Sequence, residues 1–260
     1  MCGRYASSRK PEDLARLFGV ESWDPDEAPA PAWNIAPTVP VHAVLERPLK
    51  GADPQAGPVR QLRPLRWGLV PSWAQSPAVA VKMINARSET VHEKPAYRRC
   101  FASRRCLLPA DGYYEWVAPE AEPGAPRKGR APKQAYFITP ADGSVMAMAG
   151  LYEFWRDPKA PQDHPDAWWA TCTVITTAAE PALAAVHPRM PLALTPDSWD
   201  AWLDPALNDP ERVRALLVPP PPGLMEVRPV SAAVGSVRND GPELQRRWQP
   251  VPAEGGTTLF

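Results

Sequence analysis

The proline content of this chain is the strongest constraint on its fold. The 260 residues include 36 prolines, about 14% of the chain against a usual share of about 5%. Proline lacks the backbone donor and its ring clashes inside a helix, so long helices are excluded over most of the sequence. The composition favours short strands joined by rigid turns.

The charges of the chain balance. Lysine and arginine together number 29, as do aspartate and glutamate, so the formal net charge is +0. This excludes a cationic nucleic-acid coat protein and leaves local charge to guide any charged partner. The chain has no apolar run of 18 residues and no apolar signal-peptide core after Met1. We therefore expect a cytoplasmic protein without a membrane contact.

Short apolar segments through the middle of the chain predict a sheet. We predict strands within residues 39–45, 62–70, 106–116, 135–139, 145–155 and 170–177. Asp142-Gly143 between two of these segments predicts a hairpin. Short helices are predicted to begin at Pro11, Pro196 and Pro210, since proline is favoured at the first helical position.

These segments predict a single α+β domain with a mainly antiparallel, barrel-like β core and peripheral short helices. We expect the domain to span residues 2–248. The polar residues 249–260 are predicted to form a flexible C-terminal tail, and residues 118–133, rich in Pro, Gly, Lys and Arg, a mobile insertion.

The four cysteines are not arranged as metal ligands or disulfide partners. They form no CxxC pair, and a reducing compartment keeps them as thiols. Three of them lie in or beside apolar runs and are predicted to be buried thiols: Cys100, Cys106 and Cys172. The adjacent Trp168 and Trp169 are predicted to lie in the core.

Cys2 is the residue with the most distinctive chemistry. Removal of Met1 would give Cys2 a free α-amine next to its thiol. An α-amine has a pKa of about 8 against about 10.4 for lysine, so much more of it is neutral near pH 7. The amine can attack an aldehyde to form an imine, and the thiol can then close a five-membered thiazolidine ring. The alternative is that Cys2 is an ordinary N-terminal residue.

Three polar residues lie beside tight or apolar sequence and are candidates for the same site. Glu115, between Tyr114 and Trp116, lies where partial desolvation suits a carboxyl to proton transfer. His187 titrates near neutral pH and can shuttle protons. The side-chain oxygen of Asn85 can orient the N-terminal amine. The alternatives are an outward-facing strand carboxylate, a structural histidine and a turn asparagine.

Six motifs in order resemble the SOS response-associated peptidase (SRAP) domain family of abasic-site processing proteins. They are MCGRY at 1–5, WNIAP at 33–37, RWGLVP at 66–71, INARSET at 84–90, GYYEW at 112–116 and HPRMP at 187–191. The late segment of Pro229, Val230, Ser231, Val234, Gly235 and Asn239 is also similar to that family. The resemblance spans residues 2 to 244.

The resemblance implies that the protein senses abasic sites in single-stranded DNA and crosslinks to them. Mature Cys2 would act as amine and nucleophile on the open-chain aldehyde, and the thiazolidine would shield the lesion. Asn85 would position the N-terminus, while Glu115 and His187 would move protons, with Glu115 also releasing the crosslink. The peptidase role in the family name is explained most simply by self-removal of Met1. The protein would be nucleoid-associated when bound to DNA.

The resemblance also implies DNA contacts around the site. Arg4, Arg87 and Arg189 lie one or two residues from the catalytic candidates and would form a phosphate-binding cluster. Their alternative is a solvated or ion-paired state. Trp73 would stack on a base beside the lesion. Family members often carry a second aromatic residue where this chain has Ala74, which predicts a smaller stacking surface.

Two other functions remain open from sequence. A cysteine peptidase acting on other proteins would use Cys2 as nucleophile and His187 as base. A non-catalytic module would bind single-stranded DNA without becoming covalent. In each case we expect no metal and no cofactor. Self-crosslinking needs one chain only, so we expect a monomer.

Overall fold

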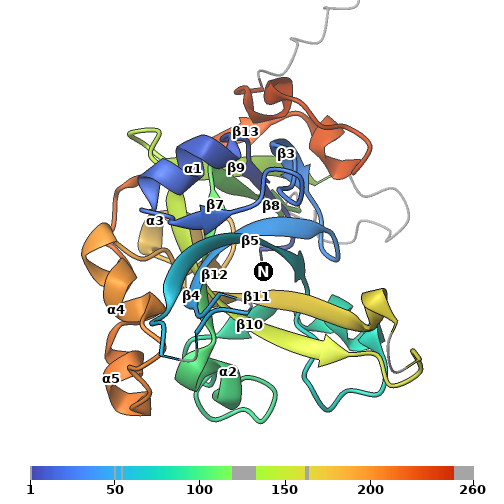
Figure 1. The fold of residues 1–260 in the computed structure, drawn as a ribbon. Helices are drawn as coiled ribbons and strands as arrows, with labels where there is room; N and C mark the ends of the chain where they lie inside the picture. Colours follow the sequence, from blue (N-terminus) through green and yellow to red (C-terminus); the bar gives the residue numbers. More distant parts are fainter. Residues whose placement is uncertain (1, 50, 54, 119–132, 162–163, 249–260) are drawn as a thin grey trace, which may run out of the picture.

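The computed structural model describes residues 2–49, 51–53, 55–118, 133–161 and 164–248. The tail predicted at 249–260 lies outside the described residues, as does the predicted insertion apart from its two end residues. The described residues form two sheets that share a core, with short helices around them (Figure 1).

Five strands close into a barrel. They are β4 (Pro40–Arg47), β5 (Val59–Trp67), β7 (Arg105–Ala110), β10 (Met146–Arg156) and β11 (Trp168–Ala178). Four antiparallel pairings run in the order β11-β10-β7-β4-β5, and a parallel pairing of β5 with β11 closes the ring. The sheet continues into β2 (Ser22–Trp23) and β12 (Arg189–Pro191), and β6 (Asn85–Arg87) pairs with β11. The predicted mainly antiparallel, barrel-like core is confirmed.

A second, antiparallel sheet packs against the barrel. Its strands, in spatial order, are β13 (Met225–Val230), β9 (Gln134–Pro140), β8 (Gly112–Val117), β1 (Tyr5–Ser7) and β3 (Ala32–Ile35). Tyr5 of β1 meets Trp67 of β5 edge-on, with 5.1 Å between ring centroids. Tyr113 and Ile138 join the same buried cluster. This interface places the beginning of the chain against the barrel.

The predicted hairpin around Asp142-Gly143 is wrong. The turn itself forms, because Gly143 adopts a φ of 71° and donates its N–H to Pro140 O at 3.1 Å. The strands on its two sides enter different sheets, however: β9 pairs with β8 and β13, whereas β10 pairs with β7 and β11. The segment 106–116 likewise divides at Asp111 into β7 and β8. A turn motif specifies a local change of direction and does not specify the pairing partner.

Short helices cover the outer face of the barrel and one face of the second sheet. The predicted starts are confirmed at Pro11 for α1 (Pro11–Leu17) and at Pro210 for α5 (Pro210–Ala215). The start at Pro196 is a 3₁₀ turn, η3 (Pro196–Ser198), that leads into α4 (Trp199–Leu203). The elements not predicted are α2 (Arg98–Ser103), α3 (Pro181–Ala184), η1 (Pro77–Lys82), η2 (Pro165–Ala167), η4 (Ala232–Gly235) and η5 (Pro242–Gln245). Phe18, Phe101 and Trp202 bury this helical layer against the barrel.

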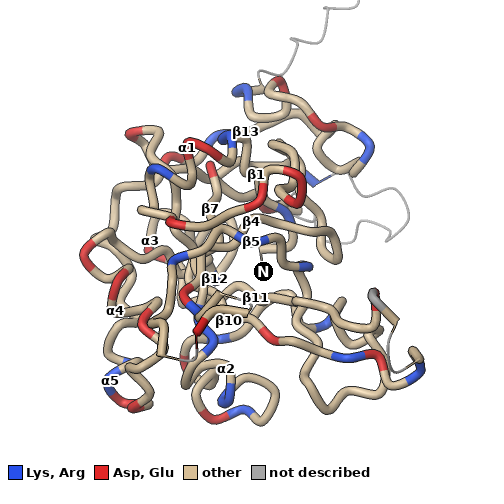
Figure 2. Tube along the Cα trace, in the orientation of Figure 1, with Lys and Arg blue, Asp and Glu red and all other residues tan. Residues whose placement is uncertain are grey.

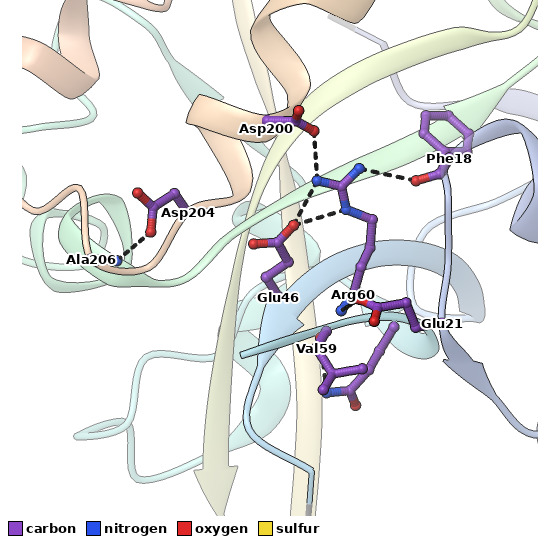
Figure 3. A network of polar contacts seen from close by, with 9 residues as sticks. Phe18, Glu21, Glu46, Val59, Arg60, Asp200, Asp204 and Ala206 are labelled. Carbon is purple, nitrogen blue, oxygen red and sulfur yellow. Dashed lines mark hydrogen bonds and ion pairs between the residues drawn. The ribbon is translucent and has the colours of Figure 1, made fainter. Parts of the chain in front are cut away.

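Arg60 of β5 joins the helical layer to the barrel (Figure 3). Its Nε and Nη2 donate to Glu46 Oε1 at 2.8 and 2.6 Å, and Nη2 also donates to Asp200 Oδ1 at 2.7 Å. Its Nη1 donates to the carbonyl of Phe18 at 3.1 Å. The guanidinium therefore ties β4 to the end of α1 and to α4, and its partners raise its pKa against the effect of desolvation.

Replacement of Arg60 by methionine is expected to lower the free energy of unfolding by about 2 kcal/mol, because it leaves the mostly buried Glu46 without its cation. Urea denaturation measures the change. Arg63→Met on the same strand is the matched control. Arg63 and Glu27 form an exposed pair at 3.8 Å, for which we expect a loss of at most about 0.5 kcal/mol. Equal losses in the two variants would contradict the role assigned to Arg60.

Candidate functional site

Cys2 lies three residues before the start of β1, in the shared core. Its side chain is 1% exposed and belongs to the cluster that contains Trp67 and Cys172 of the barrel. The thiol donates a long hydrogen bond to Arg4 O at 3.8 Å. Burial raises the pKa of the Cys2 thiol to about 12, and the negative charge of Glu115 acts in the same direction. Cys2 therefore carries a protonated thiol at neutral pH.

Asn85 contacts the Cys2 backbone directly. Its Nδ2 donates to the Cys2 carbonyl oxygen at 2.7 Å. β6 pairs in parallel with β11 through Asn85 and Val174, which fixes the position of the amide relative to the barrel. The structure thus brings Asn85 to the N-terminal segment, but through the amide nitrogen and the Cys2 carbonyl rather than through the side-chain oxygen.

Glu115 lies on β8, the strand next to β1. Tyr5 is paired with Tyr113, and Tyr114 N–H donates to Arg4 O at 2.9 Å, so Glu115 lies beside the residues that precede β1. Side chains alternate along a strand, which places Glu115 on the same face as Tyr113, toward the cluster that contains Cys2. The carboxyl residue is only 6% exposed. The alternative of an outward-facing strand carboxylate is therefore wrong.

His187 lies between α3 and β12. His187 Nδ1 lies 3.0 Å from Arg189 N and 3.1 Å from Arg189 O, so the backbone of Arg189 holds the ring in either tautomer. The neighbouring Val186 and Met190 pack against the cluster that contains Cys2. At Thr176, β11 pairs with β12 on one side and with β6 on the other. β6 carries Asn85, and β12 begins two residues after His187. Both residues therefore lie near the same end of β11.

Two of the three predicted phosphate-binding arginines have protein partners. Arg189 forms an ion pair with Glu89 and donates to Thr176 O at 2.5 Å. This contact lowers the pKa of the Glu89 carboxyl. Arg4 Nη1 donates to Asn34 Oδ1 at 2.8 Å and to Val234 O at 2.9 Å. For Arg189 the ion-paired alternative is the state observed.

Arg87 and Trp73 present their side chains to solvent. Arg87 is exposed at the end of β6, and within the described part of the chain its guanidinium makes no hydrogen bond or ion pair. Trp73 is 63% exposed. Two hydrogen bonds fix the turn that carries Trp73. Ala74 N–H donates to Pro71 O at 2.9 Å, and Trp155 Nε1 donates to Ala74 O at 2.7 Å. Both side chains are accessible to a ligand.

Asn34 has a structural role that the sequence analysis did not identify. Its Nδ2 donates to the carbonyl oxygens of Val234, Ser236 and Asn239, at 3.2, 2.9 and 2.8 Å. Asn34 therefore ties β3 to the late segment and also accepts from Arg4. The only signal in the sequence was the presence of both segments among the family motifs.

The described residues contain no group of three or more His, Cys, Asp or Glu side chains placed to hold a metal ion. Within the same residues, no helix has the length and apolar character required to cross a membrane. In the view of Figure 2, basic and acidic residues are interspersed along the trace.

The chain is similar to proteins of known families over nearly its whole length. The family model "SOS response associated peptidase (SRAP)" matches residues 1–237. Abasic site processing protein YoqW of Bacillus subtilis is 34% identical over 244 residues, which cover 94% of this chain and 98% of that protein. YedK of Escherichia coli, also named an abasic site processing protein, is 30% identical over 257 residues, covering 96% of this chain and 100% of that protein.

Two further matches extend the comparison. Abasic site processing protein HMCES of Xenopus tropicalis is 30% identical over 279 residues, covering 94% of this chain and 77% of that protein. A crystal structure of a Bacteroides thetaiotaomicron protein has the same fold, with a TM-score of 0.76 and 24% identity over 95% of this chain and 100% of that one. From the family model and these relatives we conclude that the chain belongs to the SOS response associated peptidase (SRAP) family.

Proposed function

We propose that this protein processes abasic sites in single-stranded DNA by forming a covalent thiazolidine crosslink through Cys2, after removal of Met1. The names of the relatives support abasic-site processing. The observation that carries the proposal is the 2.7 Å hydrogen bond from Asn85 to the Cys2 carbonyl, which holds the Cys2 backbone beside Glu115. An N-terminal aminothiol is thereby fixed in place rather than left mobile.

The reaction begins at the α-amine of Cys2. The amine nitrogen attacks the aldehyde carbon of the ring-opened deoxyribose, and the carbinolamine loses water to give an imine. The thiol sulfur then adds to the imine carbon, while the thiol proton passes to the nitrogen and closes the thiazolidine. A thiol with a pKa of about 12 stays protonated during the amine attack, so both atoms are available in the required order.

Glu115 and His187 are proposed to move the protons of this sequence. The carboxyl of Glu115 lies next to the Cys2 side chain and can protonate the departing hydroxyl or, in reverse, assist release of the crosslink. The backbone of Arg189 holds the His187 ring through Nδ1. Proton exchange with an oxygen of the opened sugar is assigned to Nε2.

A cysteine peptidase that acts on other proteins is the alternative function, and it predicts cleavage of a peptide pool in the absence of DNA. The peptidase activity in the family name is assigned here to the release of Met1 alone.

Intact-mass spectrometry with a single-stranded oligonucleotide bearing one abasic site tests the proposal. We expect a protein that lacks Met1 and gains the mass of the oligonucleotide minus one water. An oligonucleotide with a tetrahydrofuran analogue has no aldehyde and is expected to give no adduct. Retention of Met1, or cleavage of a peptide pool in the absence of any adduct, would overturn the proposal.

Arg87→Ala is expected to weaken DNA binding and to make it less dependent on salt. One phosphate contact fewer on a single strand changes the slope of log K against log salt by about 0.7. Fluorescence anisotropy over a series of salt concentrations measures the slope. Arg214→Ala is the control, because Arg214 lies on α5 and pairs with Glu211 at 3.8 Å. An unchanged slope in Arg87→Ala would remove Arg87 from the DNA interface.

A further inference from the structure

Trp168, at the start of β11, is 61% exposed. The prediction that Trp168 and Trp169 both lie in the core is therefore wrong for Trp168, while Trp169 is half-buried. The reason is the alternation of side chains along the strand, which sends two consecutive residues to opposite faces. One exposed apolar side chain is ordinary by itself, so the significance of Trp168 depends on the residues around it.

A hollow of about 450 Å³ lies against this indole. It is lined by Pro40, Pro64, Leu65, Arg66, Asp166, Trp168, Trp169 and Ala170. The Arg66 guanidinium lies over the Trp169 ring at 4.4 Å and donates to Thr38 O at 3.0 Å. The hollow thus combines an exposed aromatic face with a fixed cation. The negative charge of Asp166 would repel a phosphate on its side of the hollow. A phosphate of a nucleic acid would therefore lie on the side of Arg66.

The hollow is connected to the turn that carries Trp73. Trp155 Nε1 donates to Ala74 O at 2.7 Å, and the Trp155 ring meets the Trp169 ring edge-on at 5.5 Å. Ala74 and Trp169, the chain neighbours of the exposed Trp73 and Trp168, therefore pack in or against the same small cluster. Ala74 itself is buried and provides no second stacking ring.

The hollow is also connected to the candidate functional site through β11. In the unbroken register of this strand, Trp168 shares a face with Ala170, Cys172 and Val174. The last three pack in or against the cluster that contains Cys2. Val174 is in turn paired with Asn85 of β6. The same face of β11 therefore carries residues that pack around Cys2 and, at its beginning, the exposed indole of Trp168.

We propose that Trp168, with Arg66, forms a second stacking site for a nucleobase of the single-stranded DNA, at some distance from the lesion. The base stacks on the indole, and the adjoining phosphate lies on the side of Arg66. This inference rests on the proposed function, because it assigns a path to the strand that carries the abasic site. It explains how a chain with alanine at position 74 retains a second aromatic contact.

Equilibrium binding in the Cys2→Ala background, with probes that carry a tetrahydrofuran analogue and therefore no aldehyde, tests the proposal without interference from covalent bonding. The probes are a trinucleotide with the analogue at its centre and longer strands extended on the 5′ side only or on the 3′ side only. Extension on one of the two sides is expected to increase affinity. Trp168→Ala should reduce that gain roughly tenfold, since one stacked base contributes that much. Trp168→Phe should retain most of the gain.

Two further variants make the experiment specific. Arg66→Gln should reduce the same gain and make it less dependent on salt. Leu224→Ala, which changes an equally exposed apolar side chain on another pocket, should leave the gain unchanged. The proposal is overturned if Trp168→Ala retains the full gain for both extensions. Failure of the proposed function would be seen separately, as a lack of adduct when Cys2-intact protein meets the abasic strand.

Discussion

Replacement of Cys2 by alanine is expected to reduce the heat-stable DNA adduct to background. Initiator methionine is commonly removed before a small residue such as alanine, and the variant freed of Met1 in this way has the α-amine at position 2 and lacks only the thiol. It can therefore still form the reversible imine with the aldehyde. Without sulfur the thiazolidine cannot close. On a denaturing gel we expect no adduct from Cys2→Ala alone and a clear adduct when borohydride is added to reduce the imine.

Cys172→Ala is the matched control for this prediction. Cys172 is a fully buried thiol in the same cluster as Cys2, and it has a similarly raised pKa because of its burial. Removal of either sulfur leaves a small cavity of comparable size, so the two variants should lose similar stability. Only Cys2→Ala should lose the adduct. A heat-stable adduct from Cys2→Ala would exclude Cys2 as the nucleophile.

Glu115→Gln is expected to slow crosslink formation or release by about 10²- to 10⁴-fold, the range attributed to a positioned acid or base. The substitution preserves shape and removes the charge. Because the negative charge of Glu115 raises the pKa of the Cys2 thiol, its removal should lower that pKa. The rate of Cys2 alkylation should therefore rise at a lower pH than in the unmodified chain.

Glu226→Gln provides the comparison. Glu226 lies on β13 of the same sheet and forms an ion pair with Arg247 at 2.9 Å. It should change neither the crosslinking rate nor the alkylation profile. The alkylation profile measures the electrostatic effect of Glu115 on Cys2, whereas the rates of crosslink formation and release measure its part in proton transfer. Normal kinetics in Glu115→Gln for both formation and release would remove it from the mechanism.

Local features of the fold were predictable from local sequence. Proline at a first helical position marks the start of α1 and of α5, and Asp209 caps α5 by accepting from Glu211 N–H at 2.9 Å. The strand segments were recognisable because apolar residues cluster between prolines and glycines. The pairing of the strands was not recognisable from the sequence. β9 and β10 follow one another along the chain, but they belong to different sheets.

The candidate site shows the same division between local and distant information. Family motifs drew attention to Asn85 and Glu115, and the structure brings both to Cys2. The partners of Arg4 and Arg189 come from Asn34 and Glu89, which no local pattern connects with them. The exposure of Trp168 likewise depends on what packs beside β11. Such outcomes require the tertiary contacts themselves.

The parallel seam of the barrel has a consequence for the order in which this protein matures. Only two residue pairs, Arg66 with Thr171 and Trp67 with Cys172, join β5 to β11, and contacts between such distant segments form slowly during folding. Cys2 is synthesised at the start of the chain, whereas β11, which contributes Cys172 and Val174 to the cluster around Cys2, is synthesised long after it. A nascent or truncated chain therefore has the reactive residue without its surroundings.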